Sequence, residues 1–184
     1  MNMGNAVFPV CPEATSVDLE KLQGVWFVVR TNLEMWKTKR SPQITYTNLS
    51  CSSSRTTFDD TVRYYDNADA ESRNIVSTIS GVDTEQTCPS KCAHSVFQWR
   101  GNCLLKLITS DWHLAAASPS YDWAITVFEA TPFTAAGLDV YSREPFLTEA
   151  QSNAIQKCID ESPYLTRRAI GIFDAIQVKP LPLL

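Results

Sequence analysis

With 184 residues, of which 44% are hydrophobic and 20% charged, the chain has the composition of one globular domain and not of a disordered segment. Its 16 basic and 20 acidic residues are scattered and give a formal net charge of −4, so no basic stripe is available to bind nucleic acid. No apolar run reaches the roughly 20 residues that span a bilayer, which excludes a transmembrane helix. The only basic cluster, Lys37, Lys39 and Arg40, is either a solvated loop or a charged rim over a pocket mouth.

The predicted elements begin after a proline-containing leader, residues 1–16, and residues 17–184 are expected to form a single domain. Residues 17–22 predict a short helical turn that leads into the first strand. Strand-forming residues then recur in short runs separated by turn residues. These predicted strands cover residues 25–30, 44–49, 57–65, 74–80, 95–99, 104–109, 112–117, 123–128 and 138–142.

The turns between these runs are short and contain Asp, Asn, Gly, Ser or Pro, so that successive strands are expected to pair as antiparallel neighbours. No helical crossover interrupts the series. An up-and-down order of eight or nine strands closes most simply into a barrel, because closure removes the exposed edges. The sequence therefore predicts an all-β antiparallel barrel.

One helix is predicted after the last strand. Thr148, with Glu149 and Gln151 behind it, resembles a helix-capping arrangement, and the helix is expected to continue through Cys158 and to stop before Pro163. A cysteine on this helix suggests a disulfide bond that fixes the helix to the barrel wall or to the leader. The tail from residue 179 onward is expected to form no regular element.

Six cysteines, an even number spread along the chain, predict three disulfides formed in an oxidising compartment: Cys11, Cys51, Cys88, Cys92, Cys103 and Cys158. Their pairing is left open by the sequence. A zinc site is the alternative, but the only close pair lacks a second pair or histidines at ligand spacing, so that no metal is expected. The sequon that begins at Asn48 predicts N-glycosylation. Together these features predict a secreted protein or one that enters the secretory pathway.

Three short motifs resemble those of the lipocalin family, within the calycins: Gly24-x-Trp26 at the first strand, Tyr121-Asp122-Trp123-Ala124 at the penultimate strand, and Tyr141-Ser142-Arg143 at the end of the last strand. The resemblance implies an eight-stranded barrel. It also implies that Trp26 plugs one end of the barrel and that Arg143 lies across the indole, a cation–π contact worth about 0.5 to 2 kcal/mol.

A narrower set of segments is similar to fungal lipocalin-like proteins: residues 33–40, 44–46, 58–60, 99–101 and 133–143. That group includes hetero-Diels–Alderases of tropolone sesquiterpenoid pathways, so that the resemblance implies a pericyclic enzyme of secondary metabolism. Val25 and Phe27 depart from the pattern, because Thr and Tyr are frequent beside the tryptophan. Six cysteines also exceed the usual two to four.

The alternation of side chains along a strand assigns candidate residues to the inside of the barrel. If Trp26 points inward, Val28 and Arg30 are expected to point inward too. A buried arginine needs an anionic or strongly polar partner. Arg30 is therefore expected either to pair with Asp60 or Asp139, or to anchor a ligand.

Several aromatic residues are predicted to share the barrel interior and to contact a small molecule. The inward set is Tyr46, Tyr64, Phe97, Trp99, Trp112, Leu114 and Phe128. Core packing alone would also explain each of them, but together they suit a flat apolar ligand. Trp36, beside Met35 in the loop after the first strand, is interpreted as an exposed lid residue.

The two histidines, His94 and His113, are too far apart in sequence to imply a dyad. His113 alternates with Trp112, so only one of the two can face the interior, and His113 is kept as a candidate ligand contact. An exposed or satisfied histidine is the simpler interpretation of both.

No nucleophile elbow, phosphate-binding glycine loop or metal-ligand cluster occurs in the sequence. Two functions remain: a carrier of a small hydrophobic molecule, or a cofactor-independent cyclase that holds two π-systems in reactive proximity. Candidate catalytic donors are Arg30, Tyr46 and Tyr64, with Lys106 as a further donor. The expected partner in either case is a small hydrophobic molecule, and the oligomeric state is left open.

Overall fold

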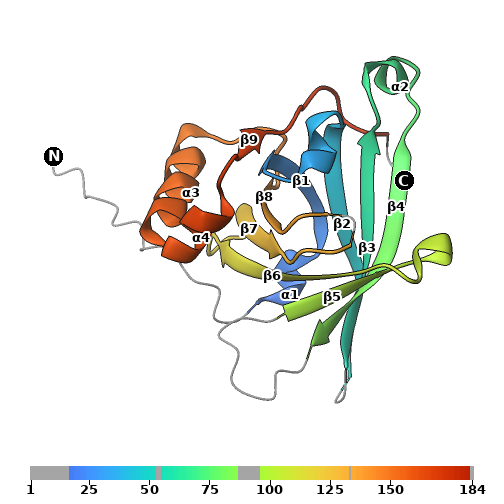
Figure 1. The fold of residues 1–184 in the computed structure, drawn as a ribbon, viewed down its shortest axis with the longest axis horizontal. Helices are drawn as coiled ribbons and strands as arrows, with labels where there is room; N and C mark the ends of the chain where they lie inside the picture. Colours follow the sequence, from blue (N-terminus) through green and yellow to red (C-terminus); the bar gives the residue numbers. More distant parts are fainter. Residues whose placement is uncertain (1–16, 53–54, 87–95, 133, 183–184) are drawn as a thin grey trace, which may run out of the picture.

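The computed structural model describes residues 17–52, 55–86, 96–132 and 134–182, which form a β-barrel with two helices packed on one side (Figure 1). The eight barrel strands have these bounds: β1 Gly24–Thr31, β2 Arg40–Cys51, β3 Thr56–Tyr65, β4 Ser77–Gln86, β5 Val96–Gly101, β6 Thr109–Ala117, β7 Trp123–Phe128 and β8 Gly137–Ser142. A ninth short strand, β9 Phe173–Asp174, is added outside the barrel next to β1.

The sheet order is β2-β3-β4-β5-β6-β7-β8-β1-β9, and an additional β1–β2 pairing closes the barrel. Every pair of neighbouring barrel strands is antiparallel. The predicted up-and-down lipocalin-type barrel is therefore confirmed.

Six short or medium helices complete the described part of the chain: α1 Leu19–Leu22, η1 Glu34–Lys37, α2 Ala68–Ser72, η2 Cys103–Leu105, α3 Glu149–Glu161 and α4 Pro163–Arg168. The predicted C-terminal helix is α3, and Thr148 and Gln151 form a reciprocal capping box at its start. No helix within these described ranges is long and apolar enough to cross a membrane.

Two hydrophobic cores result from this arrangement. One fills the barrel interior around Trp26, Trp112 and Tyr141. The other lies between the outer wall of the barrel and α3 and α4, where Ile155 and Ile159 pack near Ile125 and Val140 of the wall. The helix thus covers the outside of the barrel and leaves one end of its interior accessible.

Two predicted strands are corrected by the structure. Residues 104–109 do not form a strand of their own, because Cys103 adopts a left-handed backbone (φ 51°) and starts the η2 turn, after which Arg100 pairs directly with Thr109. The predicted strand 74–80 begins later, at Ser77, because Asn74 (φ 56°) follows α2 in a turn. Nine predicted runs thus become eight barrel strands.

The end of the barrel at α1 is sealed by Trp26 and Arg143. Trp26 is fully buried, and its Nε1 donates a hydrogen bond to the carbonyl of Leu22 at 2.8 Å. The guanidinium of Arg143 lies 3.5 Å from the centroid of the indole and donates to three backbone carbonyls within residues 21–25 at 2.6–2.9 Å. These contacts close this end, so the interior of the barrel can be reached from the opposite one.

The prediction that all six cysteines pair is wrong, because Cys51 and Cys103 are exposed free thiols. The η2 turn begins at Cys103, and the strand register places this turn near the level of Tyr46. Cys51 lies about 15 Å farther along β2, so the two cysteines are too far apart to pair. A disulfide needs Cα atoms within about 7 Å. Cys158 is disulfide-bonded. The remaining predicted cysteines, Cys11, Cys88 and Cys92, lie outside the described residues.

Candidate functional site

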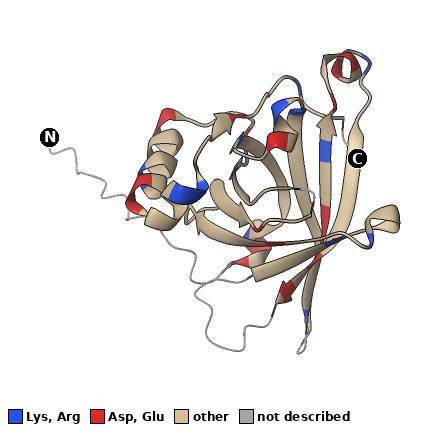
Figure 2. Ribbon diagram, in the orientation of Figure 1, with Lys and Arg blue, Asp and Glu red and all other residues tan. Residues whose placement is uncertain are grey.

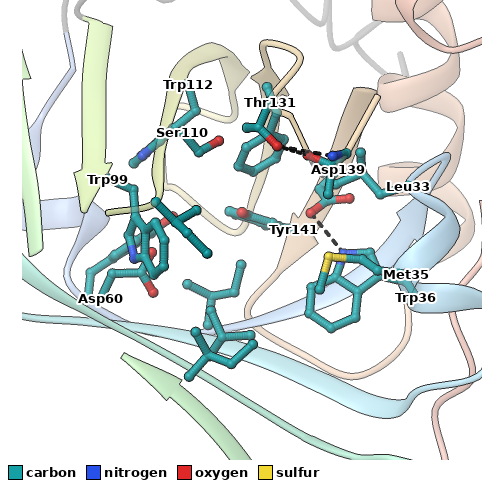
Figure 3. Close-up of a pocket in the computed structure, with 17 residues that line it drawn as sticks. Leu33, Met35, Trp36, Asp60, Trp99, Ser110, Trp112, Thr131, Asp139 and Tyr141 are labelled. Atoms are coloured by element: carbon teal, nitrogen blue, oxygen red, sulfur yellow. Dashed lines mark hydrogen bonds between the residues drawn. The ribbon is translucent and has the colours of Figure 1, made fainter. Parts of the chain in front are cut away.

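A cavity of about 230 Å³ occupies the barrel interior, away from the sealed end (Figure 3). Its wall is mostly apolar and aromatic, with a few polar groups. The apolar members are Leu33, Met35, Trp36, Ile44, Val62, Ile79, Ile108, Trp99, Trp112 and Phe128, and the polar members are Tyr46, Asp60, Ser110, Thr131, Thr134, Asp139 and Tyr141. No lysine, arginine or histidine occurs among these lining residues.

Strand alternation explains why these side chains meet. On β2, β3 and β8, pairs of lining residues are separated by one residue, as Asp60 and Val62 are on β3, and as Asp139 and Tyr141 are on β8. Figure 3 shows Asp60 and Asp139 on opposite sides of the cavity, with Tyr141 between them. The barrel thus brings two carboxyl groups and a phenol from distant segments into one apolar space.

Asp139 is almost completely buried at the η1 side of the cavity. Its Oδ2 accepts a hydrogen bond from Nε1 of Trp36 at 3.3 Å, and its Oδ1 has no hydrogen-bond partner. Burial raises the pKa of Asp139 to about 7, and the neighbouring polar groups of Thr31 and Trp36 partly counteract this rise. Near neutral pH, Asp139 is therefore divided between a carboxylic acid that can donate a proton and a carboxylate that can accept one.

A second acidic group lies across the cavity, where Asp60 and Asp83 interact. Nε1 of Trp112 donates a hydrogen bond to Oδ1 of Asp83 at 2.7 Å. The pKa of Asp60 is raised well above its usual value, mainly by burial and in addition by the neighbouring Asp83. Burial also raises the pKa of Asp83, to about 7. Because two adjacent buried carboxylates repel each other, the pair retains a proton at neutral pH. Oδ1 of Asp60 and Oδ2 of Asp83 have no hydrogen-bond partner.

Two buried phenols, Tyr46 and Tyr141, complete the polar part of the cavity. Burial raises the pKa of both well above 10, so both stay neutral. Tyr46 stacks on Trp112 with ring centroids 5.7 Å apart. The hydroxyl of Tyr141 has no hydrogen-bond partner. A buried polar group without a partner is rare in folded proteins, and here four such atoms, including the unpartnered carboxyl oxygens, lie in or beside one cavity.

Five of the residues predicted to contact a ligand line this cavity: Trp36, Tyr46, Trp99, Trp112 and Phe128. Tyr64, Phe97 and Leu114 belong to the surrounding buried core and do not form its wall. Trp99 can lie across β4 because Gly81 has no side chain there: a Cβ at Gly81 would lie 2.3 Å from Nε1 of Trp99.

The prediction that Arg30 points inward is wrong. The pairing of β1 with β8 is shifted between Val28 and Arg30, so the alternation changes there and the next residue, Thr31, is buried instead. Outside the barrel, Nε of Arg30 bonds Asp174 at 3.0 Å and its Nη2 bonds Ser152 of α3 at 2.8 Å. Arg30 therefore pairs with neither Asp60 nor Asp139 and does not contribute to the cavity.

The prediction for His113 is also wrong, because on β6 the side chain of Trp112 faces the interior. Nε2 of His113 lies 3.4 Å from the hydroxyl of Tyr164 on α4, outside the barrel. Lys106 is exposed on the η2 turn and does not reach the cavity. His94 lies outside the described residues.

Trp36 occupies the expected position at the open end of the barrel, but it is not exposed. Only 3% of its surface is accessible, since η1 turns the indole inward against Tyr64, with ring centroids 5.8 Å apart, and toward Asp139. The indole is thus part of the cavity wall, and its hydrogen bond orients the carboxyl group.

The acidic residues of the cavity are the main feature that sequence reasoning missed. The sequence alone predicts Asp60 and Asp139 only as possible partners of Arg30 and assigns no role to Asp83. A usable signal was present, because Asp60 alternates with the inward residues Phe58, Val62 and Tyr64 along β3. An acid in such an inward series marks a polar group inside the barrel.

The sequon asparagine, Asn48, is exposed on β2 with a left-handed backbone (φ 54°), and its side-chain amide donates to Asp59 at 2.7 Å. Glycosylation at this position stays a prediction.

No protein-family model matches the chain, and no curated protein matches it. Solved structures do match nearly its whole length. Lobster apocrustacyanin A1 is 14% identical with a TM-score of 0.56, over 97% of this chain and 94% of that one. Insecticyanin from the tobacco hornworm Manduca sexta is 12% identical with a TM-score of 0.60, over 91% and 84%. The siderocalin Ex-FABP is 6% identical with a TM-score of 0.60, over 87% and 96%.

At these identities the likeness shows the fold alone. The class it defines is the lipocalin-type barrel, with eight antiparallel strands and a C-terminal helix against the wall. The particular features of this chain are the buried Asp60–Asp83 pair and the Trp36–Asp139 contact inside its cavity.

Proposed function

We propose that the barrel encloses a small, largely apolar molecule that carries one hydrogen-bonding oxygen. The observation that carries this proposal is the cavity itself, with indole and aliphatic walls and unpartnered polar atoms of Asp60, Asp139 and Tyr141. A ligand oxygen would satisfy buried polar groups that are costly to leave unpaired. The siderocalin Ex-FABP, a structural neighbour, is itself described by its dual ligand specificities.

The size and charge of the cavity narrow the ligand class. The cavity volume of about 230 Å³ lies below the roughly 300–1,000 Å³ that is typical of small-molecule sites, so a molecule of one or two fused rings fits better than a long chain. Because the wall carries carboxyl groups and no basic side chain, an anionic ligand is disfavoured. A neutral aldehyde, ketone, quinone-like compound or phenol suits the site.

Quenching of tryptophan fluorescence by three related probes tests this proposal. We expect 1-naphthaldehyde to bind saturably, naphthalene to bind about tenfold more weakly because it offers no acceptor, and 1-naphthoate not to bind. The variant Ser110→Leu, which fills part of the cavity, is expected to weaken binding of the aldehyde. Thr78→Leu, on the exposed outer face of β4, is the matched control and leaves binding unchanged. Equal binding of all three probes, or no effect of Ser110→Leu, would contradict the proposal.

A second candidate is a cofactor-independent cyclase that catalyses a hetero-Diels–Alder reaction. It is favoured by the buried acids, since a neutral carboxylic acid at Asp139 or Asp60 can donate a hydrogen bond to the carbonyl oxygen of a quinone methide. The alkene of a terpene then adds across the methide carbon and this oxygen, so that one C–C and one C–O bond form and no atom is lost. The resemblance to fungal lipocalin-like enzymes points to the same reaction.

The cyclase is tested by adding the purified protein to a quinone methide generated in solution with humulene as the alkene. We expect faster product formation than in buffer, with a changed product ratio, and at least about tenfold less acceleration in Asp139→Leu. Phe146→Leu, far outside the cavity on an exposed turn, is the control. If the protein binds the product tightly but neither the rate nor the selectivity exceeds background, the carrier function is the correct one.

We also propose that the protein passes through the secretory pathway and that the exposed sequon at Asn48 is glycosylated there. Expression in a eukaryotic host with a secretion signal is expected to give a glycosidase-sensitive mass that is lost in Asn48→Gln. A single unchanged mass for both forms would count against glycosylation at this site.

A further inference from the structure

The η2 turn between β5 and β6 carries two leucines that contact almost nothing. Leu104 is 98% exposed and Leu107 is 95% exposed, the highest values among the large hydrophobic residues in the described ranges. Single exposed apolar residues are common on protein surfaces. Two that are nearly fully exposed on one short turn form an unpartnered apolar tip, which we call the leucine tip.

The leucine tip is held in a defined shape. The amide of Leu105 bonds the carbonyl of Asn102 at 2.9 Å, and that of Ile108 bonds the carbonyl of Leu105 at 2.8 Å. Leu105 packs over Gly101, where a Cβ would lie 2.3 Å from the Cβ of Leu105. The turn thus partly buries its middle leucine, Leu105, and presents Leu104 and Leu107 to the outside.

Basic side chains accompany the leucine tip. Nη1 of Arg100 donates to the carbonyl of Lys106 at 3.0 Å, which ties one cation to the turn that carries the other. Both residues, with Arg55, line a shallow groove along the outer face of β4 and β5 whose lining includes no acidic residue. In Figure 2 this turn projects from the barrel and carries the blue of basic residues but not the red of acidic ones. In a chain of net charge −4, this local excess of positive charge is notable.

The leucine tip also lies beside the entrance to the cavity. Ile108 follows Leu107 directly and lines the cavity, as does Ser110 at the start of β6. The sealed end, at Trp26 and Arg143, is at the other end of the barrel. Whatever binds the leucine tip is therefore close to the route by which a ligand enters.

We propose that the leucine tip docks on the surface of a membrane that contains anionic lipids. Leu104 and Leu107 insert at the boundary between headgroups and acyl chains, while Lys106 and Arg100 contact lipid phosphates. Charge complementarity selects an anionic lipid surface as the occupant, because the apolar tip is bordered by cations. Docking in this orientation brings the cavity entrance toward the membrane, where apolar molecules concentrate. The docking does not depend on the identity of the ligand.

Flotation with vesicles tests the proposal on the full chain. We expect binding to vesicles of mixed phosphatidylcholine and phosphatidylserine, and at least about fivefold weaker binding to phosphatidylcholine alone. The double variant Leu104→Ser with Leu107→Ser is expected to lose about tenfold or more in vesicle affinity. Arg100→Gln with Lys106→Gln is expected to lose the preference for anionic vesicles and its sensitivity to salt.

Ile170→Ser is the matched control, because Ile170 is also exposed (76%) but lies after α4, away from the leucine tip. It is expected to bind vesicles like the unmodified chain. The proposal is overturned if the unmodified chain does not float with anionic vesicles, if the double leucine variant floats equally well, or if Ile170→Ser loses binding to the same extent.

A different outcome would assign the leucine tip to a second copy of the chain instead. In that case the chain self-associates in sedimentation without binding vesicles, and the self-association disappears in the double leucine variant. Binding of 1-naphthaldehyde, measured in the same variants, is expected to stay unchanged.

Discussion

Nε1 of Trp36 donates a hydrogen bond to Oδ2 of Asp139 inside the barrel, at 3.3 Å. The two residues come from η1 and β8, and their contact brings an indole from the open end against a buried carboxyl group. Because the second oxygen of Asp139 has no partner, the contact orients the acid and leaves one of its oxygens available.

The free energy of unfolding is expected to fall as pH rises from about 4 to about 7, in part through Asp139. An unfolded aspartate has a pKa near 3.9, and in the folded protein burial raises the pKa of Asp139 to about 7. The folded state therefore holds the proton more tightly, and its advantage is present below about pH 4 and lost as pH rises through 7. One such group accounts for up to roughly 4 kcal/mol of the free energy of unfolding.

Urea unfolding of the unmodified chain and of Asp139→Asn at pH 5 and pH 8 measures this pH dependence. The variant is expected to lose less stability over the interval, and identical pH profiles would contradict the assignment.

Binding of a carbonyl ligand is expected to weaken above pH 7. The neutral form of Asp139 can donate a hydrogen bond to a ligand oxygen, whereas the ionised form cannot and repels it. Titration of the unmodified chain with 1-naphthaldehyde at pH 6 and pH 8.5 is expected to show at least about fivefold weaker binding at the higher pH. In Asp139→Asn the pH effect is expected to shrink. Stronger binding at high pH would indicate that the ligand pairs with the carboxylate instead.

Replacing Arg143 by methionine is expected to destabilise the protein by about 2 to 4 kcal/mol. The change removes the cation over Trp26 and the side-chain donor to the carbonyls of Lys21, Gln23 and Val25. Arg73→Met is the control, since the side chain of Arg73 makes an exposed ion pair with Asp69, and its replacement is expected to change stability by less than about 0.5 kcal/mol. Chemical denaturation compares the two. Equal stability of both variants would show that the contacts of Arg143 with Trp26 and the backbone carbonyls do not stabilise the folded protein.

A methyl group at Gly81 is expected to displace Trp99 from the cavity wall. The added Cβ would lie 2.3 Å from Nε1 of Trp99 and 2.6 Å from the carbonyl oxygen of Arg100, so the indole or the strand must move. We expect a loss of about 1 to 3 kcal/mol in stability and weaker binding of 1-naphthaldehyde. Unchanged tryptophan emission and unchanged binding in Gly81→Ala would contradict this packing.

The sequence by itself determined the class of fold. Alternating β-rich runs with short turns, the Gly24-x-Trp26 motif and the capping residues at Thr148 are local signals, and they predicted the barrel and α3. Local periodicity is set by backbone geometry, which is the same wherever a strand occurs.

Only the tertiary structure decided which side chains reach the cavity. A single shift in the β1–β8 pairing moved Arg30 to the outer surface, and a left-handed residue at Cys103 turned a predicted strand into the leucine tip. The partners of Asp139 and Asp60 are far apart in the chain, and the pKa of each acid depends on burial by several strands at once. Register and burial are properties of the closed barrel, so alternation within one strand could suggest Asp60 and Asp139 but could not show them facing one cavity.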